Sequence, residues 1–160
     1  QEVLTAAPLS GIITSYGLKE EMKDISPPSA PPTETATMIE ALNWHRQNNP
    51  NRPHITFYQD QGKGKEITYI RLYEEAHKIS SSLKELGLKP KERVGIMLPT
   101  GQEYFFCFIA IMMAGGIPVP VYPPTRMSQV FEHMQRHARI FSNCQAVFMI
   151  TSKEIKKLGA

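Results

Sequence analysis

The sequence is poor in the residues from which disulfide frameworks and nucleic-acid surfaces are built. Its 160 residues include only two cysteines, Cys107 and Cys144, neither in a CxxC pair and each among apolar residues. We therefore expect two buried thiols in a reducing compartment, and a cytoplasmic location. The net charge is +3, yet no basic run with interleaved aromatic residues occurs, so we expect no nucleic-acid partner.

Metal-binding motifs are equally scarce. His133 and His137 lie four residues apart on a predicted helix and therefore share a face. No HExxH glutamate or nearby cysteine completes a ligand set, and Arg136 and Arg139 would repel a cation. We interpret this segment as a polar helix face and expect no metal site.

The sequence also shows no nucleophile with its activating base and no phosphate-binding motif. The adjacent Glu74 and Glu75 point in different directions from a predicted helix, and Ser80-Ser81-Ser82 has no base at a useful spacing. The segment QDQGKGK lacks the GxxxxGK[ST] pattern of a phosphate loop, so we interpret it as a hairpin turn. From the residues alone, we assign no catalytic, cofactor-binding or metal-binding side chain.

One long uncharged stretch, from Tyr104 to Thr125, raises the question of a membrane span. Two glycines and four prolines interrupt it, and they would break helical hydrogen bonds that lipid cannot replace. A buried helix followed by a strand is the better interpretation, and we expect no transmembrane segment.

The first 36 residues differ in composition from the rest. The segment ISPPSAPPTETAT concentrates proline, serine and threonine, which favours an extended linker or arm. The chain opens on Gln1 rather than Met, without a signal-peptide pattern, and we expect it to be a piece of a longer protein.

Ordered structure is expected from Thr37, where TMIE is a capping-box pattern that begins a helix ending near NNPNRP. Two strand-like runs follow, HITFY and EITYI. From Arg71 the apolar residues have the spacing of one helix face, with Thr68 as N-cap and Gly87 as the C-terminal stop. That face comprises Leu72, Ala76, Ile79, Leu83 and Leu86.

The remaining segments alternate between strands and helices. RVGIML, IPVPVY and AVFMIT are predicted strands, of which the proline-bearing IPVPVY should be irregular or lie at an edge. Predicted helices cover residues 101–114, buried on nearly all sides, and 128–143, and another begins at Ser152. In the second of these, one face contains Phe131, Met134, Ala138 and Phe141. The alternation predicts an α/β fold of three layers, with a mainly parallel sheet and helices on both faces.

Three segments in fixed order carry a resemblance to a known family. TYIRLYEEA is followed by GIMLPTGQEYFFCFIAIMMAGGIPVPV and then by VYPPTRMSQVFEHMQRHARIFSNCQAVFMIT. The first two resemble conserved segments of the adenylate-forming enzymes, which include acyl-CoA synthetases, peptide-synthetase adenylation domains and fatty acyl-AMP ligases. The third, with its Tyr-Pro-Pro, is similar to the fatty acyl-AMP ligases in particular. The resemblance covers Thr37 to about Thr151.

The resemblance implies that residues 37–160 are an incomplete N-terminal part of an AMP-binding (adenylation) domain. It also implies that the longer parent uses ATP and Mg²⁺ to convert a fatty acid into an acyl-adenylate, for transfer to an acyl carrier protein or CoA. In this family a Ser/Thr/Gly-rich loop ending in lysine holds the phosphates, and a late lysine assists adenylation. Thr151-Ser152-Lys153 contains too few Ser, Thr and Gly residues to be that loop. We therefore expect no residue here to bind ATP or Mg²⁺, and this chain to be inactive alone.

Two alternatives stay open beside the ligase. A fragment of an acyl-CoA synthetase would have the same segments, and a ligase-specific insertion later in the chain would separate the two. A non-catalytic binding module that retains the fold would lack the phosphate loop and the late lysine.

Overall fold

The computed structural model describes residues 33–59, 62–123 and 130–153. Apart from Thr33, all of them belong to one unit of the chain, Glu34–Ala160. The predicted linker or arm lies almost wholly outside the described residues and stays a prediction. The same holds for the side chains of Phe131, His133 and Met134.

Helix α2 (Met38–Asn48) begins at the predicted capping box. The Thr37 hydroxyl oxygen accepts a hydrogen bond from the Glu40 N–H at 3.1 Å, and the Glu40 carboxylate accepts from the Thr37 N–H at 3.2 Å. The carboxylate also accepts from the Ala36 N–H at 2.7 Å. Two backbone donors of the cap and first turn, and the N–H of Ala36 just before them, are thereby satisfied, and the prediction is confirmed.

Strands β1 (Pro53–Gln59) and β2 (Gly62–Thr68) form the predicted hairpin, with Ile55 opposite Ile67. Two details of the prediction are wrong. The GKGK segment is the first half of β2 rather than the turn, and EITYI is a strand only as far as Thr68. The Thr68 side chain accepts from the Arg71 N–H, which caps the next helix and draws Tyr69 into it.

Helix α3 (Tyr69–Glu85) buries Leu72, Ala76 and Leu83, as predicted, but Leu86 is 68% exposed. The helix ends at that point, because Gly87 adopts a φ of 95° and reverses the chain. The Gly87 N–H donates to the carbonyl of Lys84, and the Leu88 N–H donates to that of Leu83, both at 3.0 Å. This Schellman arrangement folds Leu88 back into the core in place of Leu86.

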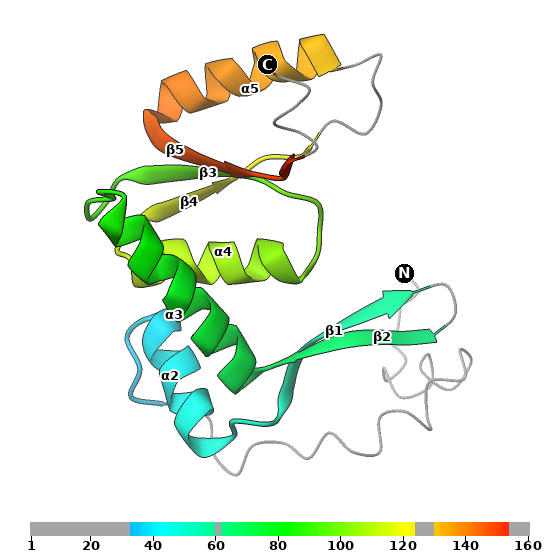
Figure 1. The fold of residues 1–160 in the computed structure, drawn as a ribbon. Coiled ribbons are helices and arrows are strands. Elements are labelled where there is room, and N and C mark those ends of the chain that lie inside the picture. The colour runs from blue at the N-terminus through cyan, green and yellow to red at the C-terminus, as the bar shows by residue number, and fades with distance from the viewer. Residues whose placement is uncertain (1–32, 60–61, 124–129, 154–160) are drawn as a thin grey trace, which may run out of the picture. The chain divides into compact units, whose positions relative to one another are not determined.

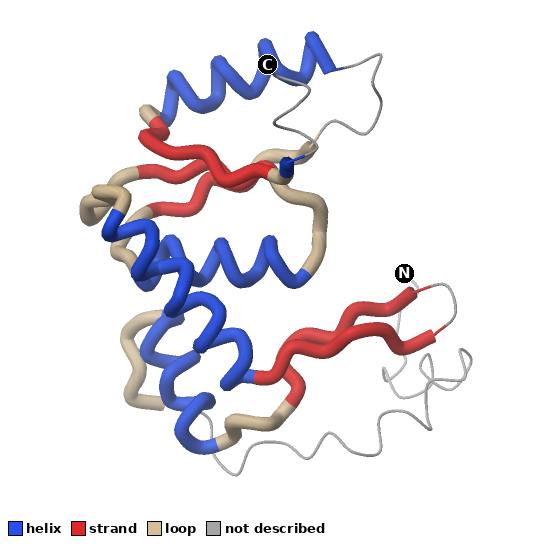
Figure 2. Tube along the Cα trace, in the orientation of Figure 1, coloured by secondary structure: helices blue, strands red, loops and turns tan. Residues whose placement is uncertain are grey.

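Strands β3 (Arg93–Met97), β4 (Ile117–Pro120) and β5 (Ala146–Thr151) form a parallel sheet in the order β4-β3-β5. Figure 1 shows helix α4 (Gln102–Met113) on one face of this sheet and helix α5 (Val130–Cys144) on the other. The tube in Figure 2 shows the alternation of strand and helix along this part of the chain. The predicted three-layer α/β arrangement is confirmed. In the described part of the chain, however, β2 pairs with β1 and does not join this sheet.

Two apolar clusters hold the layers together. One joins α2, the hairpin, α3 and α4 through a buried set made of Leu42, Ile67, Leu72, Ala76, Phe106, Ile109 and Ala110. The other joins α3 and α4 to the sheet through Leu83, Leu88, Val94, Ile96, Ile111 and Ala114. Helix α4 contributes to both, so it is apolar around most of its circumference, as predicted.

The glycine pair Gly115-Gly116 ends helix α4. Gly115 has a φ of 84°, and the Gly116 N–H donates to the Ile111 carbonyl at 2.9 Å. A Cβ on Gly116 would lie 3.0 Å from the Ile111 side chain and 3.2 Å from the Glu92 carbonyl oxygen. The helix therefore stops abruptly and its end approaches the start of β3 closely.

Helix α5 turns Phe141 toward the sheet, as predicted, but the prediction is wrong at Ala138. Ala138 is exposed, whereas His137 is buried with 5% of its surface accessible, so the expected polar face is also wrong at this position. Phe141 lies directly over Gly95 of β3. Gly95 has no side chain, which leaves room for the ring at this point of β3.

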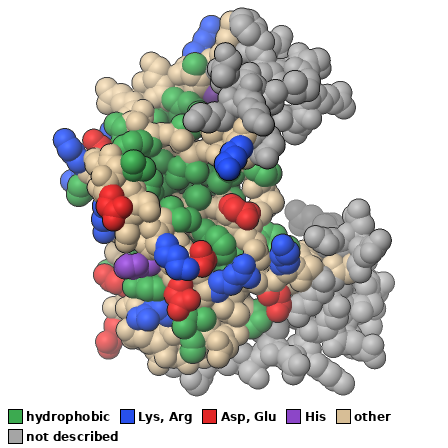
Figure 3. Space-filling model, viewed as in Figure 1, with side chains coloured by type: hydrophobic (Ala, Val, Ile, Leu, Met, Phe, Trp, Pro, Cys, Tyr) green, Lys and Arg blue, Asp and Glu red, His purple; other side chains and the backbone are tan. Residues whose placement is uncertain are grey.

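Strand β5 is less buried than its apolar sequence suggests. Phe148 and Ile150 pack against the core beneath the sheet, but Val147 and Met149 are about half exposed on the other face. Figure 3 shows hydrophobic side chains gathered over the sheet and α4, with charges of both signs elsewhere on that face. No helix in the described residues is long and apolar enough to cross a membrane. Lys153 is helical, and the rest of the helix predicted from Ser152 lies outside them.

Candidate functional site

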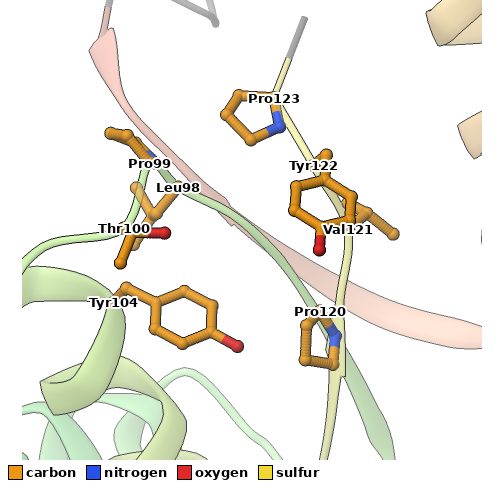
Figure 4. A pocket seen from close by; sticks show the side chains of 8 residues that line it. All are labelled: Leu98, Pro99, Thr100, Tyr104, Pro120, Val121, Tyr122 and Pro123. Carbon is orange, nitrogen blue, oxygen red and sulfur yellow. The ribbon is translucent and has the colours of Figure 1, made fainter. Parts of the chain in front are cut away.

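A cavity of about 470 Å³ opens at the carboxyl ends of β3 and β4. The residues that follow β3 form one side, and those that end and follow β4 form the other (Figure 4). Its lining comprises Leu98, Pro99, Thr100, Tyr104, Pro120, Val121, Tyr122 and Pro123. Ligands of parallel α/β sheets bind outside the carboxyl ends of the strands. We call this space the strand-end cavity.

Backbone pairing between β3 and β4 places one wall of the strand-end cavity. The Ile117 N–H donates to the Glu92 carbonyl, and the Val121 N–H donates to the Ile96 carbonyl at 2.9 Å. Pro118 and Pro120 fall between these donors, at positions where the nitrogen faces away from β3 in a parallel ladder. The prolines thus lie where β4 is the edge strand of the described sheet, as predicted, and Val121 is still held against β3.

The opposite wall comes from the start of α4. Gly101 is the N-cap, and Tyr104 lies in the first turn of the helix, where its ring projects beneath Thr100 toward the cavity (Figure 4). The ring packs edge-on against Phe105 at a centroid distance of 5.3 Å and stacks near Phe108 at 6.2 Å. Its position is therefore set by two aromatic neighbours on the same helix.

The strand-end cavity is electrically neutral along the residues described. The eight described lining residues include no Asp, Glu, Lys, Arg or His, and their polar side-chain groups are the hydroxyls of Thr100, Tyr104 and Tyr122. The Glu103 carboxylate lies in the first turn of α4, near Gly101, where it offsets the positive end of the helix. Phosphate sites use basic side chains or clustered N–H donors. This cavity suits an apolar group instead.

A second cavity, of about 320 Å³, lies on the other side of α4. We call it the inner cavity. Its lining comes from α2, β1, α3 and α4, and comprises Met38, His54, Ile55, Leu72, Tyr104, Phe105, Phe108 and Ile109. Tyr104 thus lines both cavities.

His54 belongs to an aromatic stack beside the inner cavity. Tyr69 lies between two imidazoles, at centroid distances of 4.4 Å from His45 and 4.5 Å from His54. Burial lowers the pKa of both histidines, and the positive charge of Arg52 lowers it further. Both rings are consequently neutral at pH 7, which keeps the boundary of the inner cavity uncharged.

The structure shows where the histidines, serines and glutamates considered above for metal binding or catalysis lie. No group of three or more potential metal ligands occurs among the described residues. Of the histidine pair, only the side chain of His137 is described, and it is a buried residue of α5. The hydroxyls of Ser81 and Ser82 donate to helix carbonyls four residues earlier, those of His77 and Lys78. Glu75 forms an ion pair with Lys78 at 2.7 Å on the helix surface.

The two cysteines are both free, and Cys107 is buried as predicted, whereas Cys144 is only partly buried. Burial, with a smaller effect of the Glu103 carboxylate, raises the pKa of the Cys107 thiol to about 11. A thiol that stays protonated at neutral pH is a poor nucleophile, so Cys107 is a core residue.

The sequence analysis predicted IPVPVY as an irregular or edge strand and did not predict the strand-end cavity. The signal that was available is the pairing of two uncharged, proline-bearing strand ends, LPT after one strand and VYPP after another. Parallel strands bring such ends to the same edge of a sheet. The volume between them depends on the side chain of Tyr104, which the pattern does not place.

Comparisons with known proteins identify relatives for most of the described chain. The family model described as AMP-binding enzyme matches residues 42–159. Over 98 residues, 61% of this chain, the sequence is 33% identical to tyrocidine synthase 3 of Brevibacillus parabrevis, of which the match covers 1%. Over the same length it is 29% identical to crotonobetaine/carnitine–CoA ligase of Proteus mirabilis, with 61% of this chain and 18% of that enzyme covered.

Among solved structures, the fatty acid AMP ligase of Legionella pneumophila matches with a TM-score of 0.68 and 27% identity. The match covers 78% of this chain and 21% of that one. The chain thus spans about a fifth of the length of that ligase, and less of the two sequence relatives.

Proposed function

The chain belongs to the AMP-binding enzyme family, and from this premise we propose that it is the N-terminal part of a fatty acyl-AMP ligase. The longer protein would join a fatty acid to the AMP of ATP, release pyrophosphate and pass the acyl group to the thiol of a carrier protein. The match to a fatty acid AMP ligase over 78% of the chain supports this proposal most directly. The sequence Tyr122-Pro123-Pro124, whose first two residues line the strand-end cavity, adds to it.

The described residues do not fit magnesium and a triphosphate. They contain no cluster of potential metal ligands, and the strand-end cavity has no basic side chain among its described lining residues. The reaction spreads negative charge over phosphoryl oxygens and needs such groups to stabilise it. We therefore assign no step of adenylation to these residues, whose role is to build the sheet edge and its apolar cavity.

The test is exchange of labelled pyrophosphate into ATP with a medium- or long-chain fatty acid, run on this chain and on the longer protein. We expect exchange by the longer protein and none by the 160-residue chain. Loss of one charge-stabilising donor typically costs about 10²–10³ in rate, and here the whole set is missing. Exchange by the chain alone would contradict our placement of the phosphate site elsewhere.

Two other functions are separated by further arms of the same test. The match to a CoA ligase favours an acyl-CoA synthetase as the second candidate. Acyl transfer to CoA but not to a phosphopantetheinylated carrier protein would support that candidate against ours. A longer protein that catalyses no exchange with any fatty acid would support a non-catalytic module. We also propose a cytoplasmic location, supported by the two free thiols.

A further inference from the structure

The two outer strands of the parallel sheet differ in what they offer to a further strand. The sheet runs β4-β3-β5, so β4 and β5 are its outer strands in the described residues. In β4, Pro118 and Pro120 turn their nitrogens away from β3, and a proline nitrogen has no hydrogen to donate. Prolines at such positions prevent a further strand from pairing. The outer edge of β4 is therefore closed.

The backbone of β5 leaves donors and acceptors on its outer side. The Glu92 and Ile96 carbonyls of β3 accept bonds from β4, and backbone groups point to alternate sides of a strand, so those of Gly95 point to β5. Gly95 is opposite Met149. In a parallel pair, the residue opposite such a position points its own N–H and C=O outward, and so does the residue two places on. We call the outward N–H and C=O groups of Met149 and Thr151 the β5 edge, and no strand in the described residues pairs with it.

The side chains of β5 leave this edge unprotected as well. The strand AVFMIT contains no proline and no charged residue. Val147 is 49% exposed and Met149 is 47% exposed, on the face of the sheet that Phe141 covers at Gly95. Charges and prolines are two of the usual means by which proteins keep an outer strand from pairing, and β5 has neither. Its edge can therefore accept another uncharged strand.

We propose that two copies of this chain pair through the β5 edge, antiparallel and about a twofold axis at Met149. An identical strand is a suitable partner because it is uncharged, so pairing brings no like charges opposite each other. Centred on Met149, the pair overlaps most of the strand and sets Phe148 opposite Ile150 of the second copy. A centre nearer Thr151 would shorten the overlap. The centred register places apolar side chains against each other on both faces of the joined sheet.

The association should be weak and should stop at the dimer. Stable interfaces bury about 1,200–2,000 Å², and a single pair of six-residue strands buries less. We expect a dissociation constant on the order of 100 µM. The net charge of +3 on each copy opposes association, so added salt should strengthen it. Two copies use both open edges, and the β4 edges are closed, so no larger assembly follows.

Sedimentation equilibrium of the 160-residue chain over about 5–500 µM tests the association. We expect the mean mass to rise from that of the monomer toward that of the dimer. Amide hydrogen exchange then locates the contact. Exchange at Met149 and Thr151 should slow about threefold across this concentration range, because their N–H groups are bonded only in the dimer. The N–H groups of Phe148 and Ile150 face β3 and should be protected at every concentration.

An exchange of charges tests the register. Met149→Lys sets two like charges opposite each other across the axis, and so does Met149→Glu, so each should weaken association at least about tenfold. An equimolar mixture of the two variants sets opposite charges together and should associate within about threefold of the wild type. Because Met149 is about half exposed, both variants should fold, and the wild-type concentration series decides the matter without them. Tyr58→Lys adds the same charge at an exposed tyrosine of β1 and is the matched control, which should associate as the wild type does.

A monomer mass at every concentration up to about 500 µM would overturn the proposal. Protection of the Met149 amide that does not depend on concentration would do the same, because another part of the chain would then cover the β5 edge. Growth beyond the dimer, equal weakening by Tyr58→Lys, or a mixture that associates no better than its components would each overturn it too. Association needs neither ATP nor a fatty acid, so these results are independent of the proposed function.

Discussion

Replacing Gly95 with alanine tests whether α5 packs directly on the centre of the parallel sheet. Gly95 is buried in β3, the middle strand, and the Phe141 ring of α5 covers it. A Cβ at this position would lie 2.5 Å from Cε1 and 2.9 Å from Cζ of that ring. Ordinary contacts begin near 3.4 Å, so either the ring or the whole helix must move outward.

The magnitude follows from two opposing effects. Extra atoms in a packed core cost about 1–3 kcal/mol, whereas alanine in a strand interior is better than glycine by about 0.5–1 kcal/mol. Gly95→Ala should therefore lower the free energy of unfolding by roughly 0–2.5 kcal/mol. In a Phe141→Ala background the clash is gone, so Gly95→Ala should raise the free energy of unfolding by about 0.5–1 kcal/mol. The sign reverses only if ring and strand are in contact.

The assay is a double-mutant cycle from urea unfolding followed by circular dichroism, with equal m-values as the condition for comparing midpoints. Phe141→Leu replaces Phe141→Ala if the latter is too unstable to analyse. Gly101→Ala is the control, because a Cβ there has no neighbour nearer than 3.4 Å. Additive effects of the two substitutions would refute the packing of α5 on Gly95.

Three further predictions concern burial and protonation. Ile109→Asp should abolish soluble folding, because an unpaired carboxylate in the core cluster costs several kcal/mol, out of a free energy of unfolding that is typically about 5–15 kcal/mol. A soluble variant that unfolds cooperatively would show that the helix is exposed. At about pH 8, Ellman's reagent should modify Cys144 in the folded chain but Cys107 only on unfolding, since its pKa is about 11; equally fast reaction of both would contradict the burial. The free energy of unfolding should fall as the pH drops through 6.5, because the lowered pKa values of His45 and His54 mean that the unfolded chain binds protons at a higher pH than the folded chain. Urea midpoints measured against pH should show this slope in the wild type and a flatter one in the variant that combines His45→Gln and His54→Gln.

Several features of this protein were predictable because the interactions that produce them are local. The capping box of Thr37 and Glu40 joins residues three apart, and it lies where the sequence pattern places it. Gly87 and Gly115 end their helices through hydrogen bonds that reach back only a few residues. The apolar β3 and β5 were predicted to lie in one parallel sheet because helices intervene between short buried strands. The family resemblance had the same basis, in the order of these local segments.

The errors had both local and tertiary causes. EITYI has the composition of a strand, but the Thr68 cap gives its last residues to α3, and its pairing with β1 excludes it from the parallel sheet. Leu86 continues the helical period, yet Leu88 is buried instead because the chain reverses at Gly87. His137 is buried and Ala138 is exposed, whereas Phe141, predicted on the same face as Ala138, does lie over Gly95 of β3.

The sequence alone determined where helices begin and end and which segments are apolar enough to be covered, since a few neighbouring residues decide those matters. Tertiary structure decided which strands pair, which face of α5 meets the sheet, and that the ends of β3 and β4 enclose a neutral cavity. The reason is geometric: a cavity is the space left among side chains from several elements, and Tyr104 becomes a shared wall only when α4 lies beside β3 and β4. No period or motif in one segment specifies that space.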